Sequence, residues 1–136
     1  MAGYSLSSGV TNSHRTFIEK LLAATGKAIE IPEGLQNALT GTSGSGPAYF
    51  FRFVEAMVDG AVEMGLSRED ATTLTIQTIV GAAALLDGSE DSPARLREKV
   101  TSPNGTTFAA LNSFNDSDIL YERIMFKVKS VVLPTL

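Results

Sequence analysis

The sequence contains no cysteine and a single histidine, His14, in 136 residues. Without cysteine the chain forms no disulfide, offers no thiol nucleophile and builds no cysteine-ligated zinc site. One imidazole is too few for a multi-histidine metal centre and gives little support to a serine–histidine–aspartate triad. These absences predict that the chain holds no metal ion and does not act through a cysteine nucleophile.

Basic residues are also scarce, because 11 Lys and Arg stand against 15 Asp and Glu and no basic cluster is present. Nucleic acids and anionic membranes need a basic surface that displaces counterions, so we expect neither as a partner. No signal peptide is visible, and the charge-free run 71–86 is too short and too rich in threonine to span a bilayer. With 43% hydrophobic and 19% charged residues, we expect a cytoplasmic globular protein.

The beginning of the chain differs in pattern from the rest. It predicts a strand, a helix and a second strand, at 3–7, 16–24 and 27–31. Asn12 or Ser13 is the expected cap of the helix, and Gly26 its expected end. Such a unit is seldom stable alone, because its strands normally belong to a larger sheet. We therefore predict a first domain remnant at 1–32 and a helical domain at 33–136.

Two long helices are expected in the helical domain. The first opens at Pro47, carries one narrow polar stripe and ends at Gly65, after which Ser67 and Asp70 resemble a capping box. The second, 71–86, has no charged residue on any face and should be buried all round. A domain of this size can hardly surround such helices by itself, so the simplest explanation is that a partner chain covers them.

Two loops of small residues, 42–47 and 101–107, each lead into a helical pattern. A loop without bulky side chains lets a ligand approach the backbone, and the helix start behind it favours an anion. Around the second loop, Ser92 should cap a short helix that ends at Lys99, and Gly105 is expected at positive φ. The end of the chain predicts a helix capped by Thr106 or Thr107 and ending near residue 113, a turn at 115–117 and an amphipathic helix over 119–132.

Four segments, 39–51, 63–66, 81–83 and 100–107, resemble in order and separation the C-terminal half of pyrroline-5-carboxylate reductase. The resemblance covers the whole chain, and the thirteen residues of the first segment and the eight of the last are its most specific parts. It implies a mainly α fold, in which a helical dimerisation domain like that of 6-phosphogluconate dehydrogenase follows a strand-helix-strand remnant of a Rossmann domain.

The same resemblance implies an oxidoreductase of proline biosynthesis that uses NADPH or NADH and forms a homodimer or a higher oligomer. No G-x-G-x-x-G motif follows a strand in this sequence, so the dinucleotide turn is missing. We therefore expect the chain to be a fragment that binds no cofactor and has no activity on its own. A noncatalytic dimerisation module derived from the family is the alternative.

Site residues are carried over by matching positions, and the resemblance assigns each its role. The substrate carboxylate meets the backbone N–H groups of Gly105, Thr106 and Thr107, and the Thr107 hydroxyl faces the ring nitrogen. Glu90 falls where the family has an acidic residue near that nitrogen. The other expected contacts are Ser102, Pro103 and Asn104 for the substrate, and Ser43, Gly44, Ser45 and Val100 for the cofactor.

Plainer interpretations stand beside these assignments. Thr107 can be a helix cap, a role that is compatible with catalysis. Glu90 can be a solvated charge in an acidic turn, and Gly44 and Gly46 can serve close helix packing. Many family members have glycine at position 104, and asparagine there tolerates left-handed backbone geometry.

Overall fold

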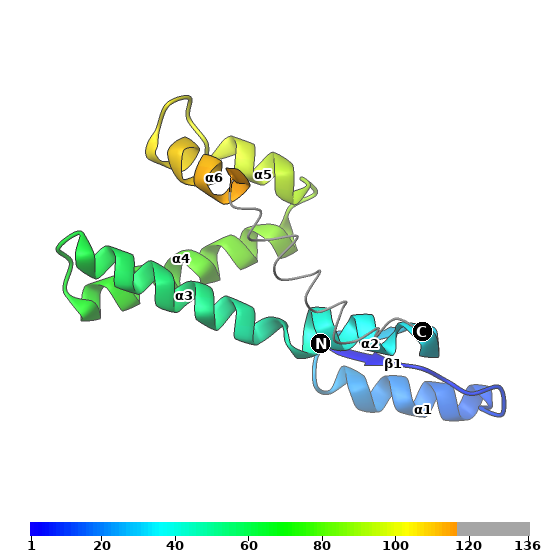
Figure 1. The fold of residues 1–136 in the computed structure, drawn as a ribbon. Coiled ribbons are helices and arrows are strands. Elements are labelled where there is room, and N and C mark those ends of the chain that lie inside the picture. Colours follow the sequence, from blue (N-terminus) through cyan, green and yellow to red (C-terminus); the bar gives the residue numbers. More distant parts are fainter. Residues whose placement is uncertain (117–136) are drawn as a thin grey trace, which may run out of the picture. The chain divides into compact units, whose positions relative to one another are not determined.

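The computed structural model describes residues 1–116, which fall into two compact units. Met1–Pro47 form the N-terminal unit, and the helical unit begins at Ala48. Figure 1 shows the elements of both in chain order. The predicted fold, mainly helical with a short strand-helix-strand segment at the start, is confirmed. The domain boundary expected after residue 32 stays a prediction.

The N-terminal unit contains the predicted strand-helix-strand segment. Strands β1 (Ala2–Tyr4) and β2 (Ala28–Glu30) pair in parallel, and α1 (Asn12–Ala23) connects them. The expected cap at Asn12 or Ser13 is wrong, because the helix already begins at Asn12 and the Thr11 hydroxyl accepts a hydrogen bond from the backbone N–H of His14. Gly26 follows the end of the helix at φ 123°, as predicted.

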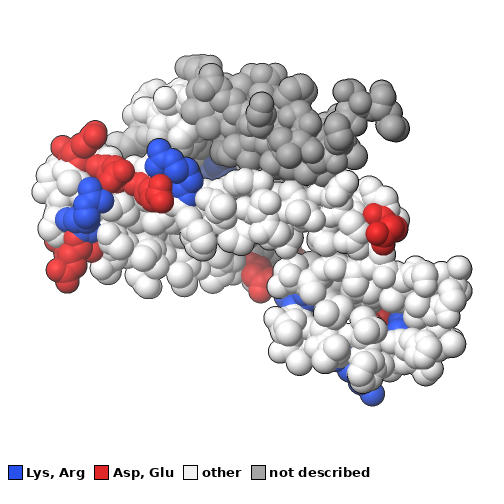
Figure 2. Space-filling view, turned by 60° about the horizontal axis from the view of Figure 1, so that its bottom comes forward, with Lys and Arg blue, Asp and Glu red and all other residues white. Residues whose placement is uncertain are grey.

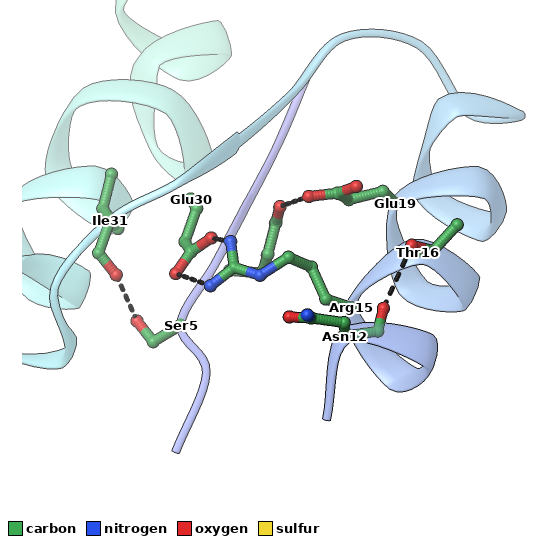
Figure 3. Close-up of polar contacts among 8 residues, drawn as sticks. Ser5, Asn12, Arg15, Thr16, Glu19, Glu30 and Ile31 are labelled. Carbon is green, nitrogen blue, oxygen red and sulfur yellow. Dashed lines mark hydrogen bonds and ion pairs between the residues drawn. The ribbon is translucent and has the colours of Figure 1, made fainter. Parts of the chain in front are cut away.

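Side-chain contacts fasten α1 to the two strands (Figure 3). The Arg15 guanidinium forms a two-pronged ion pair with the Glu30 carboxylate, and the Tyr4 hydroxyl donates to Glu19 Oε1 at 3.1 Å. Partial burial and the hydrogen bond to Glu19 raise the pKa of Tyr4 above its usual 10.0. Since Arg15 and Glu19 are four residues apart, they share the face of α1 that meets the sheet.

The chain after β2 is helical almost without interruption. It forms a 3₁₀ turn at Glu33–Leu35, α2 (Gln36–Leu39) and a π-helical turn η2 (Thr40–Gly44). The predicted loop over 42–47 is therefore wrong, because the Ser45 N–H donates to the Thr40 carbonyl at 2.8 Å and keeps the backbone coiled until the next helix begins. Leu39 packs against Gly3 so closely that a Cβ at that glycine would collide with it.

The helical unit opens with two antiparallel helices, α3 (Gly46–Glu63, begun in the N-terminal unit) and α4 (Arg68–Gly88). Gly65 ends α3 at φ 106°, and the N–H groups of Gly65 and Leu66 donate to the carbonyls of Val62 and Ala61. These two bonds make a Schellman motif. The predicted cap at Ser67 is confirmed, since its hydroxyl accepts from the Asp70 N–H at 3.0 Å, but the return contact of the capping box differs, because the Asp70 carboxylate accepts from the Ser67 hydroxyl at 2.7 Å and not from the Ser67 N–H.

Helix α4 is largely exposed in the single chain. Only Ala71 and Thr75 are buried along it, and 80–88 are exposed throughout, so the predicted burial on all sides requires a partner chain and stays a prediction. In Figure 2, charged side chains gather near the turn between α3 and α4, and a long uncharged surface extends from there. The exposed large side chains of α4 are Leu74, Ile76, Val80, Leu85 and Leu86.

Two shorter helices follow, α5 (Pro93–Lys99) and α6 (Thr106–Asp116). The Ser92 hydroxyl accepts from the Arg95 N–H at 3.2 Å, which confirms the predicted cap. The turn expected at 115–117 is wrong for its first two residues, because α6 extends through Asp116. The ring centroid of Phe114 on α6 lies 6.4 Å from that of Phe53 on α3. The remainder of that turn and the predicted helix over 119–132 lie outside the described residues. Within residues 1–116 no helix has the length and apolarity needed to cross a membrane.

Candidate substrate loop

The loop between α5 and α6 is a tight, internally bonded turn. The Thr101 hydroxyl donates to the Arg97 carbonyl at 2.7 Å and closes the end of α5. Four residues later the Gly105 N–H donates to the Ser102 carbonyl at 3.1 Å, with Pro103 and Asn104 between them. Asn104 has φ 58°, so the four residues have the proline, the left-handed third residue and the closing bond of a type II turn.

The expected positive φ at Gly105 is wrong. In this turn the third residue needs the left-handed region, and that residue is Asn104. Gly105 is required for a different reason: a Cβ there would lie 2.5 Å from the Ser102 hydroxyl oxygen and 3.3 Å from the Ser102 carbonyl oxygen. The glycine therefore provides space for the closed turn.

Gly105 also begins α6. Its carbonyl accepts from the Ala109 N–H at 3.1 Å, so it occupies the N-cap position, and the expectation that Thr106 or Thr107 caps the helix is wrong by one or two residues. The Gly105 N–H is used by the turn. The N–H groups of Thr106 and Thr107 have no acceptor among the described residues.

The start of α6 therefore presents two open backbone donors behind a loop of small side chains. Donors of this kind, together with the positive end of the helix dipole, favour a small anion. Ser102 and Asn104 are exposed and Thr107 is half-buried. These features give the loop the chemistry of a carboxylate-binding turn, with two of the three expected backbone donors available.

Glu90 is exposed in the connection between α4 and α5, whereas the loop follows α5, so the two lie at opposite ends of that helix (Figure 1). The expected place of Glu90 near the substrate stays a prediction. Seven helical residues span about 10 Å. Its neighbour Asp91 forms an ion pair with Lys99.

The expected cofactor residues lie on different elements. Ser43 and Gly44 are in the π-helical turn and Ser45 closes it, all in the N-terminal unit. Val100 is the exposed C-cap of α5, in the helical unit. Close packing among residues 1–116 does not explain Gly44, because an added Cβ would make only an ordinary 3.7 Å contact with Thr40, and at Gly46 it would meet none of these residues within 4 Å.

A hollow of about 400 Å³ at the carboxyl ends of β1 and β2 was not predicted, although that edge of a parallel sheet is where ligands commonly bind. Its charged lining is acidic, since Glu30 and Glu33 contribute to it and no basic residue does. The β1–α1 connection contains one glycine, Gly9, and Thr11 already caps the helix behind it. These residues do not fit a dinucleotide pyrophosphate, which needs a glycine-rich turn and an open helix start. Among the described residues, no group of acidic or histidine side chains is arranged to hold a metal ion.

Comparisons with known proteins agree with the sequence resemblance. Residues 33–129 match the family model for pyrroline-5-carboxylate reductase dimerisation. The chain is 50% identical over 109 residues to the pyrroline-5-carboxylate reductase of Pseudomonas aeruginosa, covering 78% of the chain and 40% of that protein. It is 43% identical over 108 residues to the Arabidopsis thaliana reductase, covering 79% of the chain and 39% of the relative.

Solved structures show the same similarity. A pyrroline-5-carboxylate reductase from Coxiella burnetii superposes with a TM-score of 0.89 at 34% identity, covering 96% of this chain and 49% of that one. The Plasmodium falciparum enzyme, solved with NADP bound, gives a TM-score of 0.85 at 28% identity, covering 96% and 53%. The chain thus spans less than half the length of these two curated relatives and about half of the solved chains.

Proposed function

Since the chain belongs to the pyrroline-5-carboxylate reductase family, we propose that it supplies the dimerising helices and the substrate loop of a reductase. The complete enzyme reduces 1-pyrroline-5-carboxylate to L-proline with NADPH or NADH in proline biosynthesis. The observation that carries the proposal is the closed turn at 102–105, which leaves the N–H groups of Thr106 and Thr107 open at the start of α6.

The substrate carboxylate binds at this loop, contacted by 102–107. Thr107 is the catalytic residue of the set, because its hydroxyl sits one residue beyond the first open donor and can reach the ring nitrogen of a substrate held there. Glu90 remains the second catalytic candidate, as the acidic neighbour of that nitrogen. Its separation from the loop by α5 makes Thr107 the stronger of the two.

A homodimer, or a multiple of it, covers the apolar surface of α4. Leu74 and Leu85 are 57% and 60% exposed in the single chain, although both belong to a helix that carries no charge between residues 71 and 86. Large uncovered apolar surfaces of this kind are typical of interfaces. The family model that matches residues 33–129 is a dimerisation model, which supports a second copy as the partner. We propose a cytoplasmic location and no membrane or nucleic-acid partner.

The chain alone does not bind NADPH and is inactive, because its strand-helix-strand segment lacks the glycine-rich turn and its hollow is acidic. Ser43, Gly44, Ser45 and Val100 border only the nicotinamide end of the cofactor in the complete enzyme. Calorimetric titration of the chain with NADPH tests this. Micromolar binding would contradict the proposal.

The substrate loop itself is tested by nuclear magnetic resonance titration with L-proline and with sulfate. We expect saturable shifts of the Thr106 and Thr107 amide signals at millimolar concentrations. The start of α4 is the internal control, because the Ser67 hydroxyl occupies one donor there and Glu69 and Asp70 repel anions. Equal responses at the two helix starts would refute a dedicated anion site.

The noncatalytic dimerisation module is kept as a second candidate, since the chain spans 40% of the Pseudomonas aeruginosa relative. The two candidates differ in one measurement. Joined to the nucleotide-binding half of a relative, a chain that retains the catalytic loop restores proline formation. A module that has lost reduction forms the dimer and makes no proline.

A further inference from the structure

Asn104 combines two features that make an asparagine chemically labile. It is exposed in the loop between α5 and α6, and the next residue is Gly105. Of the five asparagines in the sequence it is the one followed by glycine. Asn104 also holds φ 58°, a left-handed geometry that is sparsely populated by residues other than glycine.

From these features we infer that Asn104 is a site of spontaneous deamidation. The backbone nitrogen of Gly105 attacks Cγ of the Asn104 side chain, a new C–N bond closes a five-membered succinimide, and the side-chain nitrogen leaves as ammonia. The proton of the Gly105 N–H passes to solvent base, and solvent supplies the proton that the leaving nitrogen needs. Water then opens the ring at either carbonyl, which gives aspartate or isoaspartate at position 104.

The structure favours this reaction at Asn104 over the other asparagines of the helical unit. Glycine has no side chain to shield its nitrogen from the attacking geometry. The Gly105 N–H is held by a single hydrogen bond, to the Ser102 carbonyl across a surface turn, and that bond breaks whenever the turn opens. Asn112, which is also exposed, lies inside α6, where the backbone must unwind before the nitrogen of the next residue can attack.

The product changes the charge of the loop. A carboxylate at position 104 stands two residues before the first open donor of α6, where the helix dipole favours a negative charge. The next step rests on the proposed function: the new charge repels the carboxylate of a substrate that binds at the same donors. The isoaspartate form also lengthens the backbone of the turn by one methylene. Deamidation would thus convert the loop from a site that binds an external anion into one in which the carboxylate at position 104 occupies the start of α6.

The test is incubation of the intact chain in warm, mildly alkaline buffer, followed by trypsin digestion and mass spectrometry. The peptide between Lys99 and Arg123 contains Asn104, Asn112 and Asn115, so fragment ions compare all three in one molecule. We expect Asn104 to gain the mass of an amide-to-acid conversion at least about tenfold faster than Asn112, as both an aspartate and an isoaspartate product.

The Asn104→Gly variant is the matched control, because glycine suits the left-handed position and removes the reacting amide. The early acidic species seen for the unaltered chain on isoelectric focusing should be missing from this variant. Conversion of Asn104 no faster than that of Asn112, or an acidic species that forms as fast in Asn104→Gly, would overturn the inference. Anion binding plays no part in the mass measurement, so failure of the proposed substrate loop would leave this result unchanged.

Discussion

Replacing Gly81 by leucine tests whether α4 packs against a second copy of the chain. Gly81 lies on the face of α4 that also carries Leu74, seven residues before it, and Leu85, four residues after it. Gly81 is exposed, and a Cβ added there meets no atom of the described residues 1–116 within 4 Å. A larger side chain is therefore accommodated by the monomer, and any loss of assembly reports on the partner.

The size of the effect follows from the exposed side chains of α4. Its five exposed large apolar residues are 44% to 60% exposed, and covering them contributes about 5 kcal/mol at the usual value for burying such side chains. An inserted leucine that separates two closely packed helices costs about 1–3 kcal/mol, which weakens a dimer roughly five- to 150-fold. Leucine also improves helix propensity over glycine by up to about 1 kcal/mol, so the helix itself is not harmed.

Sedimentation or light scattering over a dilution series measures the dissociation of the dimer. Gly81→Ala is the matched control, because it gains the same helix propensity without the bulk and should dissociate like the unaltered chain or only slightly more easily. A stable, compact monomer of the unaltered chain at low micromolar concentration would refute the reasoning. So would a Gly81→Leu dimer as tight as that of Gly81→Ala.

Four further changes have defined outcomes. Asn104→Ala should lower the unfolding free energy by about 1–2 kcal/mol in a denaturant titration, whereas Asn104→Gly leaves it nearly unchanged, because only the alanine resists the left-handed backbone. Thr11→Ala should cost about 1 kcal/mol and Asn12→Ala much less, and the reverse order would show that the cap is assigned to the wrong residue. Thr107→Ala should barely change proline binding by the chain, yet should slow turnover about tenfold or more once the chain is joined to a nucleotide-binding half; equal turnover would remove Thr107 from the catalytic residues. The hydrogen bond from the Tyr4 hydroxyl stabilises the fold fully below the unfolded pKa of 10.0, and this stabilisation is lost as pH rises through the raised pKa of the folded state. The ionisation of Tyr4, measured as the difference in phenolate absorbance between the unaltered chain and Tyr4→Phe, should therefore appear only above pH 10.0.

The cap at Ser67 could be predicted because it is an isolated capping residue before a helical pattern, and the cap at Ser92 because Pro93 after it suits the first helical position. The start of α1 could not, since three capping residues follow one another from Thr11 and local preference does not choose among them. The choice depends on tertiary contacts. A helix that begins at Asn12 directs Arg15 toward Glu30 on β2, and that pairing joins residues fifteen positions apart.

The π-helical turn at Thr40–Gly44 shows a second kind of limit. Small residues and glycines predict a loop, because they are poor helix formers and leave the backbone exposed. Here the coil is maintained by the bond from Ser45 to Thr40, and α2 before it is anchored where Leu39 packs on Gly3 of β1. The second condition is a contact between residues far apart in the sequence, so it is invisible to a pattern that considers neighbouring residues alone.

The turn at 102–105 can be predicted in detail from its residues. Pro103 suits the second position of a turn, and that placement puts Asn104 at the third position, the one that requires the left-handed region in a type II turn. Gly105 then occupies the fourth position, where φ is ordinary and the lack of a side chain matters because the Ser102 oxygens lie so near. The two neighbouring positions are therefore constrained differently: residue 104 by backbone conformation, which asparagine can satisfy, and residue 105 by volume, which only glycine can. This difference explains how the chain carries asparagine at 104 while the turn that exposes the donors of α6 stays closed.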